Sequence, residues 1–575
     1  MDQNTWGYRV WGRSPFLSGR LVLSHSQQAG GHLTCILHGY LLEGSGSNLW
    51  TRAIVRALCR EGQTVHLVCQ ELHPEIYDFI AEAYVYENNG SVTNLFKRDT
   101  PYAAGCVMHK PRLGETLPVY VRDRYEEFAH VVPMVELPDE AIEDYLDRNV
   151  AVVERVVRAH GVESMHANHA VLMSVVAERV SAATGVPFAI MPHGSAIEYA
   201  VKKDRRMHAL AASAFKRAAR IFVIGPEMRR RIKDVFPEQS GIESQISDLN
   251  LGVDTAAFSL VDRNDRSGRI AMLSAVVKDS RRGKQPAAER ALRERLYSDI
   301  GESLQDTLAA VRGYEEKLPD VAVEAKLATV DWDRDEILLF VGRLIASKGP
   351  QNIVAALPRI LAQDPRARLI VVGHGPLREV LEAFLWALEH GDRTLARNIV
   401  LWGSALEGGD ATPFEEIRLY FEALEACGEL DDYFETAQEV MRPERVIFTG
   451  YLTHAELKYL MPCCDVAIFP SIVPEAGPLV FLEALASGVF PLGTYFAGMA
   501  ASIDSVAGDL PAEDAAHMKL SPDPSQTIAD IIANTRNALA LGGRHADRLR
   551  RSVLARYDWV EVGRKLVAEL TAMES

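Results

Sequence analysis

Residues 470–484 read PSIVPEAGPLVFLEA, and they follow directly on the apolar run 465–470. That run ends in proline and predicts a short buried strand, whereas residues 479–487 are good helix formers that stop at Gly488. Pro478 lies near the first helical position, where its missing N–H costs nothing. The free amides that follow it point out of the positive end of the helix, which favours a bound anion. The sequence therefore predicts an anion-binding helix start immediately after a strand.

Two carboxylates flank this helix start. Glu475 lies in the loop before it and Glu483 in its second turn, so both can face whatever the helix amides hold. Gly477, Pro478 and Leu479 are the other candidate binding residues of the turn. A sugar nucleotide fits this layout, with its phosphate on the helix end and its hydroxyls on the acids. The alternative is a surface helix whose two acids are only solvated.

The spacing of these residues resembles the donor-site motif of retaining glycosyltransferases of family four (glycosyl transferases group 1). A strand that ends in Pro-Ser comes first and is followed by a Glu in the loop. After seven further residues comes a second Glu, in a helix that ends in Ala-Ser-Gly. The resemblance implies an α/β protein of the GT-B fold, with two Rossmann-like domains facing a cleft. It also implies transfer of a hexosyl unit from a nucleoside-diphosphate sugar to a hydroxyl acceptor. In that family the acid at Glu475 holds hydroxyls of the donor sugar, and the acid at Glu483 holds the ribose.

A second motif, GRLIASKG at residues 342–349, follows the predicted strand 337–341. When a sugar nucleotide loses its sugar, negative charge accumulates on the diphosphate, and fixed cations stabilise that transition state more than the ground state. Arg343 offers a planar fork of donors and Lys348 a compact charge. The pair is similar to the family's diphosphate-binding pair. Cations in this role remove the need for a metal, so we expect neither a metal nor any cofactor besides the sugar nucleotide.

Glycine-rich turns follow predicted strands in both halves of the chain. In the first half, strand 32–40, a turn with Gly44 and Gly46, and a helix over 49–60 form the start of a βαβ unit. Glycine lets a ligand approach the backbone closely, although tight turns require glycine in any case. The resemblance implies that this turn faces the donor diphosphate. In the second half, the resemblance likewise places Gly373 and Gly375 beside the nucleotide.

Three histidines lie at the carboxyl ends of two further predicted strands. His166 and His169 end one of these strands, and His193 ends the next. Because these ends face the ligand crevice of a parallel sheet, all three are candidates for it. A histidine pair three apart can indicate a metal, but no third ligand is evident, so we predict none. The resemblance places His193 near the reactive carbon of the donor, and His166, Glu198 and Tyr199 are the candidates for acceptor binding.

The family resemblance has limits in two places. The segment 496–501 reads FAGMAA, where the family usually carries an acidic residue, so a relative with other chemistry, such as a pseudo-glycosyltransferase or a sugar-nucleotide epimerase, is one alternative. A non-catalytic protein that binds a nucleotide sugar is another. The sequence DWD at 331–333 is like the metal-binding pair of GT-A enzymes, but it precedes a strand, and we interpret it as an acidic loop. The sequence does not reveal the donor base, the acceptor or the oligomeric state.

Length and composition agree with a two-domain enzyme. At 575 residues, 48% of them hydrophobic and 24% charged, the chain exceeds the usual size of a single core. A net charge of −16 argues against nucleic acid as a partner. The basic clusters at 229–231 and 278–284 are ordinary solvated surfaces or, alternatively, contacts with anionic lipid. Seven unclustered cysteines and the lack of a long apolar run predict a cytoplasmic protein.

The predicted domains follow from these motifs. Residues 1–260 form an N-terminal acceptor domain, 261–335 a helical linker, and 336–555 the nucleotide-sugar domain. The helix-prone stretch 377–443 is a predicted insertion in that second domain. The last segment, 556–575, resembles the family's closing helix, which crosses back to the first domain.

Overall fold

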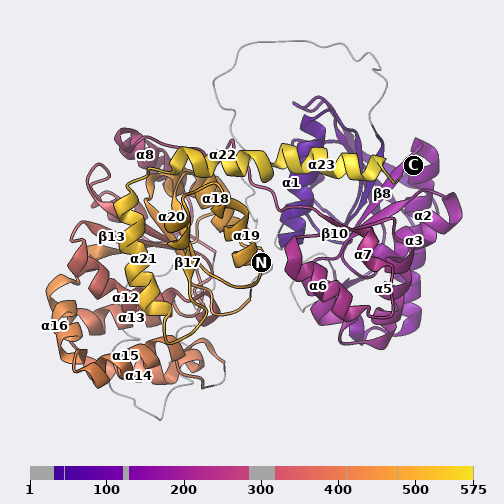
Figure 1. Ribbon diagram of the computed structural model, residues 1–575. Helices are drawn as coiled ribbons and strands as arrows, with labels where there is room; N and C mark the ends of the chain where they lie inside the picture. Colours follow the sequence, from indigo (N-terminus) through magenta and orange to yellow (C-terminus); the bar gives the residue numbers. More distant parts are fainter. Residues whose placement is uncertain are drawn as a thin grey trace, which may run out of the picture. The chain divides into compact units, whose positions relative to one another are not determined.

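The computed structural model describes residues 32–43, 46–120, 128–283, 317–409, 411–474 and 477–573. Within these ranges the chain folds into two compact units, each built on a largely or fully parallel sheet of its own (Figure 1). The first unit comprises Met1–Val223, Met228–Leu249 and Val562–Ser575, and the second comprises Ile224–Glu227 and Asn250–Glu561. The predicted α/β class with two Rossmann-like domains is confirmed. No helix in the described part of the chain is long and apolar enough to cross a bilayer.

The described strands of the first unit form a nine-stranded sheet in the order β11-β10-β9-β8-β1-β2-β5-β3-β4. Only β3 and β4 pair in antiparallel fashion. The strands of this unit are β1 (Thr34–Leu37), β2 (Val65–Val68), β3 (Ile80–Tyr86), β4 (Val92–Lys97), β5 (Cys106–Pro111), β8 (Ser164–Asn168), β9 (Phe188–Met191), β10 (Arg220–Val223) and β11 (Ile246–Asp248), with β6 (Thr116–Val119) and β7 (His130–Pro133) as a separate pair.

Helices cover this sheet and return the chain to its next strand. The longer ones are α1 (Gly46–Arg60), α2 (Asp139–His160), α3 (Met173–Thr184), α5 (Arg205–Arg217), α6 (Gly225–Val235) and α23 (Trp559–Thr571), and the shorter ones are α4 (Gly194–Ala196), α7 (Ile242–Gln245) and the π-helix η3 (Ile197–Val201). Gly161 and Gly185 end α2 and α3 in the left-handed conformation, which costs glycine little. The buried faces of α2 and α3 pack on the core of the unit, so sheet and helices form one layered body.

The second unit contains a six-stranded, fully parallel sheet in the order β14-β13-β12-β15-β16-β17. Its strands are β12 (Glu336–Val341), β13 (Ala367–Val372), β14 (Val446–Gly450), β15 (Val466–Phe469), β16 (Phe490–Thr494) and β17 (Lys519–Leu520). Its helices are α8 (Arg266–Val277), α11 (Val323–Leu327), α12 (Pro350–Gln363), α13 (Arg378–Glu389), α14 (Arg393–Trp402), α15 (Glu415–Cys427), α16 (Leu430–Val440), α17 (His454–Leu460), α18 (Leu479–Ala486), α19 (Ala497–Ala507), α20 (Ala512–Ala516), α21 (Thr527–Leu541) and α22 (Ala546–Arg556). The middle strands are buried and continuously apolar, as parallel strands covered on both faces require.

Both sheets reverse their strand order at one place. In the first sheet the chain adds β2 on one side of β1 and β8 on the other, and in the second it adds β13 on one side of β12 and β15 on the other. Loops that leave two such neighbouring strands diverge to opposite faces of the sheet. They leave a crevice outside the carboxyl ends, which is where parallel sheets bind ligands. The topology therefore gives each unit its own candidate site.

The predicted linker belongs to the second unit as far as it is described. The unit begins near residue 250, ten residues before the predicted boundary at 260, and α8 and α11 bury Leu273, Val277 and Leu327 in its core. The segment is held by a buried ion pair, since the guanidinium of Arg378 donates to both carboxylate oxygens of Asp320 at 2.9 and 2.7 Å. These apolar side chains make the segment part of a core, whereas a solvated linker would lack them.

The predicted helical insertion at 377–443 is observed as α13 to α16 with the 3-10 helix η7 (Gly403–Glu407). Its aromatic side chains Phe421, Tyr433 and Phe434 pack on one another, and the hydroxyl of Tyr433 donates to the carbonyl of Ala355 in α12. The insertion is therefore continuous with the core of the second unit. Residues 331–333 form a turn around buried Trp332, whose indole N–H donates to Leu327, and this agrees with the acidic-loop interpretation.

Candidate functional site

The loops after β12 and β15 meet at the switch point of the second unit. The amide of Ile472, two residues before Pro474, donates to the carbonyl of Ser347 at 2.9 Å. Gly349 has a φ of +72°, and a Cβ there would lie 2.0 Å from the carbonyl oxygen of Pro470. Only glycine fits this close backbone approach. The two motifs that the sequence singled out, 342–349 and 470–484, are therefore joined by main-chain contact.

The loop after β13 packs against the same structure. A Cβ on Gly373 would lie 1.8 Å from the carbonyl oxygen of Gly342, and one on Gly375 would lie 2.5 Å from that of Leu344. The amide of Leu344 donates to the carbonyl of His374 at 2.8 Å. Gly373 and Gly375 were predicted to border the nucleotide, and the structure shows that both let two loops cross. This packing accounts for the glycines without a ligand, so their nucleotide contact stays a prediction.

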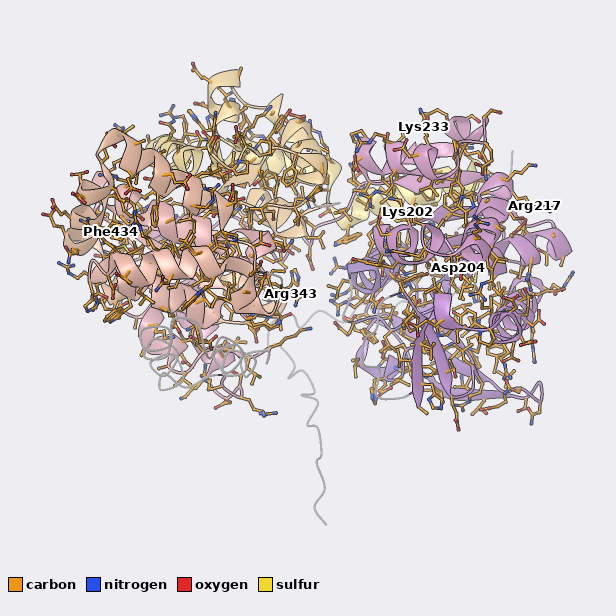
Figure 2. All side chains as sticks on the ribbon, turned by 90° about the horizontal axis from the view of Figure 1, so that it is seen from below. Lys202, Asp204, Arg217, Lys233, Arg343 and Phe434 are labelled. Atoms are coloured by element: carbon orange, nitrogen blue, oxygen red, sulfur yellow. The ribbon has the colours of Figure 1, made fainter. Side chains whose placement is uncertain are left out.

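Arg343 and Lys348 lie on this loop, in the positions that the sequence predicted. Arg343 is exposed among the side chains of the second unit (Figure 2), and Lys348 ends the 3-10 helix η6 (Ala346–Lys348) with partial burial. Glu407 of the insertion accepts a hydrogen bond from the amide of Ala346 at 2.8 Å. Burial raises the pKa of Glu407, while that hydrogen bond and the charge of Arg343 oppose the rise. The insertion thus anchors the loop that carries both cations.

Glu483 is buried in α18, with 6% of its surface exposed. Its Oε1 accepts from Nδ1 of His454 at 2.6 Å, and Oε2 has no hydrogen-bond partner among the described residues. His454 opens α17, whose first turn is fixed by the reciprocal hydrogen bonds of Thr453 and Glu456. This buried carboxylate oxygen can accept a hydrogen bond from a water or from a ligand hydroxyl.

The helix start before Glu483 differs slightly from the prediction. Pro478 is the residue that caps α18, and Leu479 is the first helical residue. Gly477 lies beside Leu251, where a Cβ would come 2.5 Å from the methyl carbon Cδ1. The first amides of a helix have no acceptor within the helix, so the anion site that the sequence predicts at this end keeps its donors. Glu475 lies outside the described residues.

The switch point of the first unit carries a buried polar network. Nε2 of His193 donates to Oδ1 of Asn168 at 3.1 Å, and Nδ2 of Asn168 donates to the hydroxyl of Thr51 at 2.9 Å. Nε2 of His38 donates to Oδ1 of Asn48 at 3.1 Å and to the carbonyl of Leu41 at 3.0 Å. His38 and His193 follow β1 and β9, Asn168 is the last residue of β8, and Asn48 and Thr51 lie on α1. One chain of hydrogen bonds therefore orients the ring of His193.

The backbone around this network is strained. His169, Leu172 and His193 have φ values of +76°, +63° and +47°, although none is glycine. The chain then passes from α4 into the π-helix η3. Positive φ at such residues costs of order 1–3 kcal/mol each, and both features concentrate at functional sites. The strain directs the His193 ring toward Asn168, and His193 keeps part of its surface exposed.

Burial keeps the histidines of this region neutral. Burial lowers the pKa of His38 to about 4. Burial, together with the neighbouring His38 and His166, lowers the pKa of His193 to about 3. Burial also holds the pKa of His169 well below its ordinary value. His169 lies against the rings of Tyr40 and Tyr120, with centroids 5.5 and 4.8 Å away. The region therefore offers neutral hydrogen-bonding groups and aromatic faces.

The remaining predicted residues differ in accessibility. His166 has no exposed surface and stacks on Trp50 with ring centroids 5.4 Å apart, so it has no face for an acceptor. Glu198 is paired with Lys202 at 2.7 Å and with Arg231 at 3.4 Å, whereas Tyr199 is 50% exposed. Of the acceptor candidates, Tyr199 is thus the most accessible.

Of the two glycines predicted in the turn after β1, only one is described. Gly46 opens α1, and a Cβ on it would meet nothing within 4 Å, so packing does not require a glycine there. Gly44 lies outside the described residues. The diphosphate contact predicted for this turn stays a prediction.

Several residues of both sites were not singled out from the sequence. They are His38, Thr51 and Asn168 in the first unit and Glu407 and His454 in the second. His38 directly precedes Gly39 at the end of the first strand, which was a usable signal because strand ends face the crevice. Glu407 had no such signal, since it lies more than fifty residues from the loop it holds.

Comparison with known families agrees with the second site. Residues 323–396 and 424–505 match the model of the family described as glycosyl transferases group 1. Over these residues the second unit is similar to group 1 glycosyltransferases. The match includes the loop of Arg343 and Lys348 and the helix of Glu483, and its gap, 397–423, falls inside the helical insertion. That gap marks the middle of the insertion as additional to the family's common core.

One curated protein matches part of the chain at low identity. An uncharacterized glycosyltransferase of Methanocaldococcus jannaschii is 26% identical over 156 residues, which cover 27% of this chain and 26% of that protein. The chain thus spans about a quarter of the curated relative that it matches.

Solved structures align over most of the chain at low similarity. A sucrose-phosphate synthase of Thermosynechococcus elongatus has a TM-score of 0.48 at 14% identity, over 94% of this chain and 99% of that one. HepE of Anabaena, solved in complex with UDP, has a TM-score of 0.47 at 14% identity, over 94% and 100%. A glycosyltransferase of Rickettsia africae has a TM-score of 0.48 at 11% identity, over 95% and 99%.

Proposed function

We propose that the protein is a retaining glycosyltransferase that moves a hexosyl unit from a nucleoside-diphosphate sugar to a hydroxyl acceptor. The observation that carries this proposal is the junction at the β12–β15 switch point. There the loop of Arg343 and Lys348 is hydrogen-bonded to the loop that leads into α18, and one oxygen of the buried Glu483 has no hydrogen-bond partner among the residues that the structure describes. Two cationic side chains that can bind a diphosphate and a carboxylate oxygen that can accept a hydrogen bond from a sugar hydroxyl thus occur on adjoining segments of one unit.

The proposed reaction breaks the bond between the anomeric carbon and the donor phosphate oxygen. The electron pair passes to the diphosphate, where Arg343 and Lys348 stabilise the charge as it develops. The acceptor oxygen forms its new bond on the face that the diphosphate leaves, and its proton passes to the departing phosphate. Glu483 binds the ribose, and Glu475 binds the donor sugar. Because two cations stabilise the leaving group, the reaction as proposed needs no metal.

The first unit supplies orientation and a water-poor surface in this proposal. The neutral ring of His193, fixed by Asn168, binds a sugar hydroxyl near the reacting carbon. Neutral imidazole suits this task because it offers a hydrogen bond without drawing in the hydration shell of a charged group. Tyr199, half exposed, is the candidate acceptor contact. The seven cysteines are free thiols, and all except Cys427 are buried, which supports a reducing, cytoplasmic location.

The experiment is release of nucleoside diphosphate from a panel of nucleotide sugars that varies the base and the sugar. At least one donor should release its nucleoside diphosphate. The release should be slow when only water is present to take the sugar and faster when a hydroxyl acceptor is added. No release with any donor, together with a thermal shift by the same nucleotides, would identify a non-catalytic binding protein. Retention is tested separately by NMR analysis of the product, in which an inverted anomeric configuration would contradict the proposed stereochemistry.

A further inference from the structure

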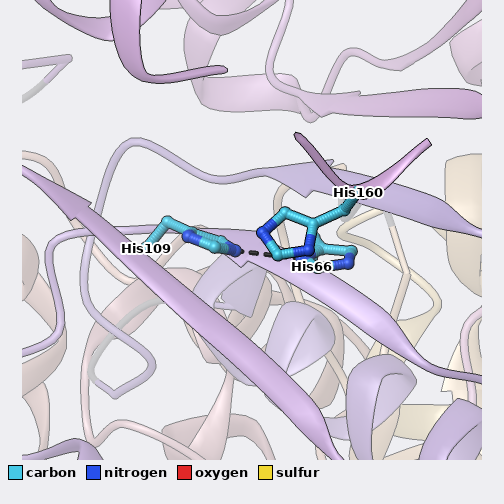
Figure 3. A group of neighbouring side chains, drawn as sticks. All are labelled: His66, His109 and His160. Atoms are coloured by element: carbon cyan, nitrogen blue, oxygen red, sulfur yellow. Dashed lines mark hydrogen bonds between the residues drawn. The ribbon is translucent and has the colours of Figure 1, made fainter. Parts of the chain in front are cut away.

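Three histidines of the first unit converge on one point away from its switch point. His66 lies on β2, His109 on the neighbouring strand β5, and His160 is the last residue of α2 (Figure 3). One ligand nitrogen from each ring lies within 4.8 Å of the other two. The rings of His66 and His109 stack with centroids 5.2 Å apart, and the ring of His160 is tilted against that of His66 with centroids 4.4 Å apart.

The fold itself brings these rings together. In the register of the two strands Val68 pairs with His109, and His66 precedes Val68 by two residues, so both histidines project from the same face of the sheet. Helix α2 ends over that face at His160, where Gly161 turns the chain. His66 and His109 are buried, whereas His160 is exposed. Two ligands are thus fixed by the sheet, and the third can turn toward them.

We propose that His66, His109 and His160 form a Zn²⁺ site that fastens the carboxyl end of α2 to the sheet. Zn²⁺ in proteins is four-coordinate, with nitrogens about 2.0–2.1 Å away, and three imidazoles plus one water are an established ligand set. Tetrahedral geometry then puts ligand nitrogens about 3.4 Å apart. Nδ1 of His66 and Nε2 of His109 are 3.0 Å apart, so this pair needs to open by only a few tenths of an ångström.

The surroundings of the three rings favour a cation. Nδ1 of His109 lies 2.8 Å from the hydroxyl of Tyr86, which can fix the ring and leave Nε2 for the metal. Hydrogen bonds from Lys97 and Tyr84 lower the pKa of Glu82 although burial opposes this, so a carboxylate charge acts on His66. The carboxyl end of α2 adds the negative end of a helix dipole.

This site is independent of the proposed transfer reaction. It uses residues that take no part in either switch point, and its effect would be on the stability of the first unit. None of these three positions formed a recognisable sequence motif, since they are 43 and 51 residues apart.

The test uses the full-length protein, freed of any histidine tag and of bound metal by a chelator, titrated with Co²⁺ and then with Zn²⁺. One equivalent of Co²⁺ should give the intense visible absorption of tetrahedral coordination, and Zn²⁺ should displace it and raise the Tm. His160→Ala removes an exposed side chain and should weaken binding by about 100-fold or more, and Tyr86→Phe by about tenfold. His130→Ala, also an exposed histidine of this unit, is the matched control and should bind like the wild type.

Two results would overturn the proposal. One is a wild-type protein that gives no tetrahedral Co²⁺ spectrum at a slight excess of the ion. The other is a His160→Ala variant that binds Co²⁺ and Zn²⁺ as tightly as the wild type. The circular dichroism spectrum of each metal-free variant, compared with that of the wild type, establishes that lost binding does not reflect an unfolded chain.

Discussion

The two switch points have the same topology and opposite chemistry. At the β12–β15 point of the second unit, an exposed arginine, a lysine and a buried carboxylate lie on adjoining segments, and within the described ranges one oxygen of that carboxylate has no partner. At the β1–β8 point of the first unit, neutral imidazoles, an amide and aromatic rings form a buried network. The sheet thus determines where a site lies, and the residues at the strand ends determine what it binds. We expect charge binding from the second unit and orientation from the first.

The largest predicted effect is the loss of a diphosphate cation. Lys348→Ala should lower kcat by about 10²–10³-fold, because the charge acts mainly on the transition state. Arg343→Ala should have a similar effect, measured in both cases as nucleoside-diphosphate release. Arg544→Ala removes an exposed arginine of the same unit and is the control for net charge. Turnover of Lys348→Ala equal to that of the control would remove the role assigned to this loop.

Glu483→Gln should weaken the binding of nucleoside diphosphate and donor by about 10–100-fold, since a hydrogen bond to a charged group contributes about 1.5–3 kcal/mol. The substitution preserves the shape of a buried side chain, so the fold should persist. Binding is measured by calorimetry, with the exposed Glu513→Gln as the control. An unchanged Kd would show that the unshared oxygen does not bind the nucleotide.

His193→Ala should distinguish the role of the first unit from that of the second, because it should affect turnover and not nucleotide binding. We expect kcat to fall by about tenfold or more while the Kd for nucleoside diphosphate stays within about twofold, because a neutral ring that orients the sugar makes no contact with the nucleotide. Steady-state transfer and calorimetry on the same preparation measure the two quantities. A parallel loss of nucleotide affinity would contradict the division of roles between the units.

The smallest predicted effect concerns pH. Burial lowers the pKa of His193 to about 3, so its ring stays neutral from pH 8 to pH 5 and the rate should show no inflection due to its protonation. A wild-type inflection near pH 6.5 that disappears in His193→Ala would contradict this.

The same lowered pKa also predicts how the stability of the folded protein depends on pH. In the unfolded chain this histidine has its ordinary pKa near 6.5 and becomes protonated below that pH, whereas in the folded protein it stays neutral. Protonation therefore favours the unfolded state, and Tm should decrease as pH falls below about 6.5.

The sequence predicted the local elements of the second unit well. Strand 337–341, helix 479–487 and the helical stretch 377–443 occur within a few residues of their predicted bounds, because apolar periodicity, Gly488 and the prolines are local features. Arg343 and Lys348 were predicted from their spacing within one strand–loop–helix segment, and Glu483 from its spacing to Glu475 in another, and their binding roles stay predictions. The junction between the two segments was not predictable, since the hydrogen bond from Ile472 to Ser347 spans 125 residues of sequence.

The first unit was harder to predict for a physical reason. Its site consists of single residues from separate strands, such as His38 and Asn168, which come together only when β1 and β8 pair. His166 and Asn168 belong to one strand, yet one is packed under Trp50 and the other bonds His193, and the sequence did not distinguish them. The charged residues of the second unit lie in short sequence motifs and can be predicted from them. The residues of the neutral network in the first unit are brought together only by the order of the strands in the sheet.

The most direct test of the account is calorimetric titration of a set of nucleoside diphosphates into the wild type, Glu483→Gln and an Arg343→Ala/Lys348→Ala double variant. We predict one binding site per chain in the wild type for at least one nucleotide, weaker binding in Glu483→Gln and no measurable binding in the double variant. Binding of equal affinity in all three proteins, or no binding to the wild type, would contradict the claim that the β12–β15 switch point holds the sugar nucleotide.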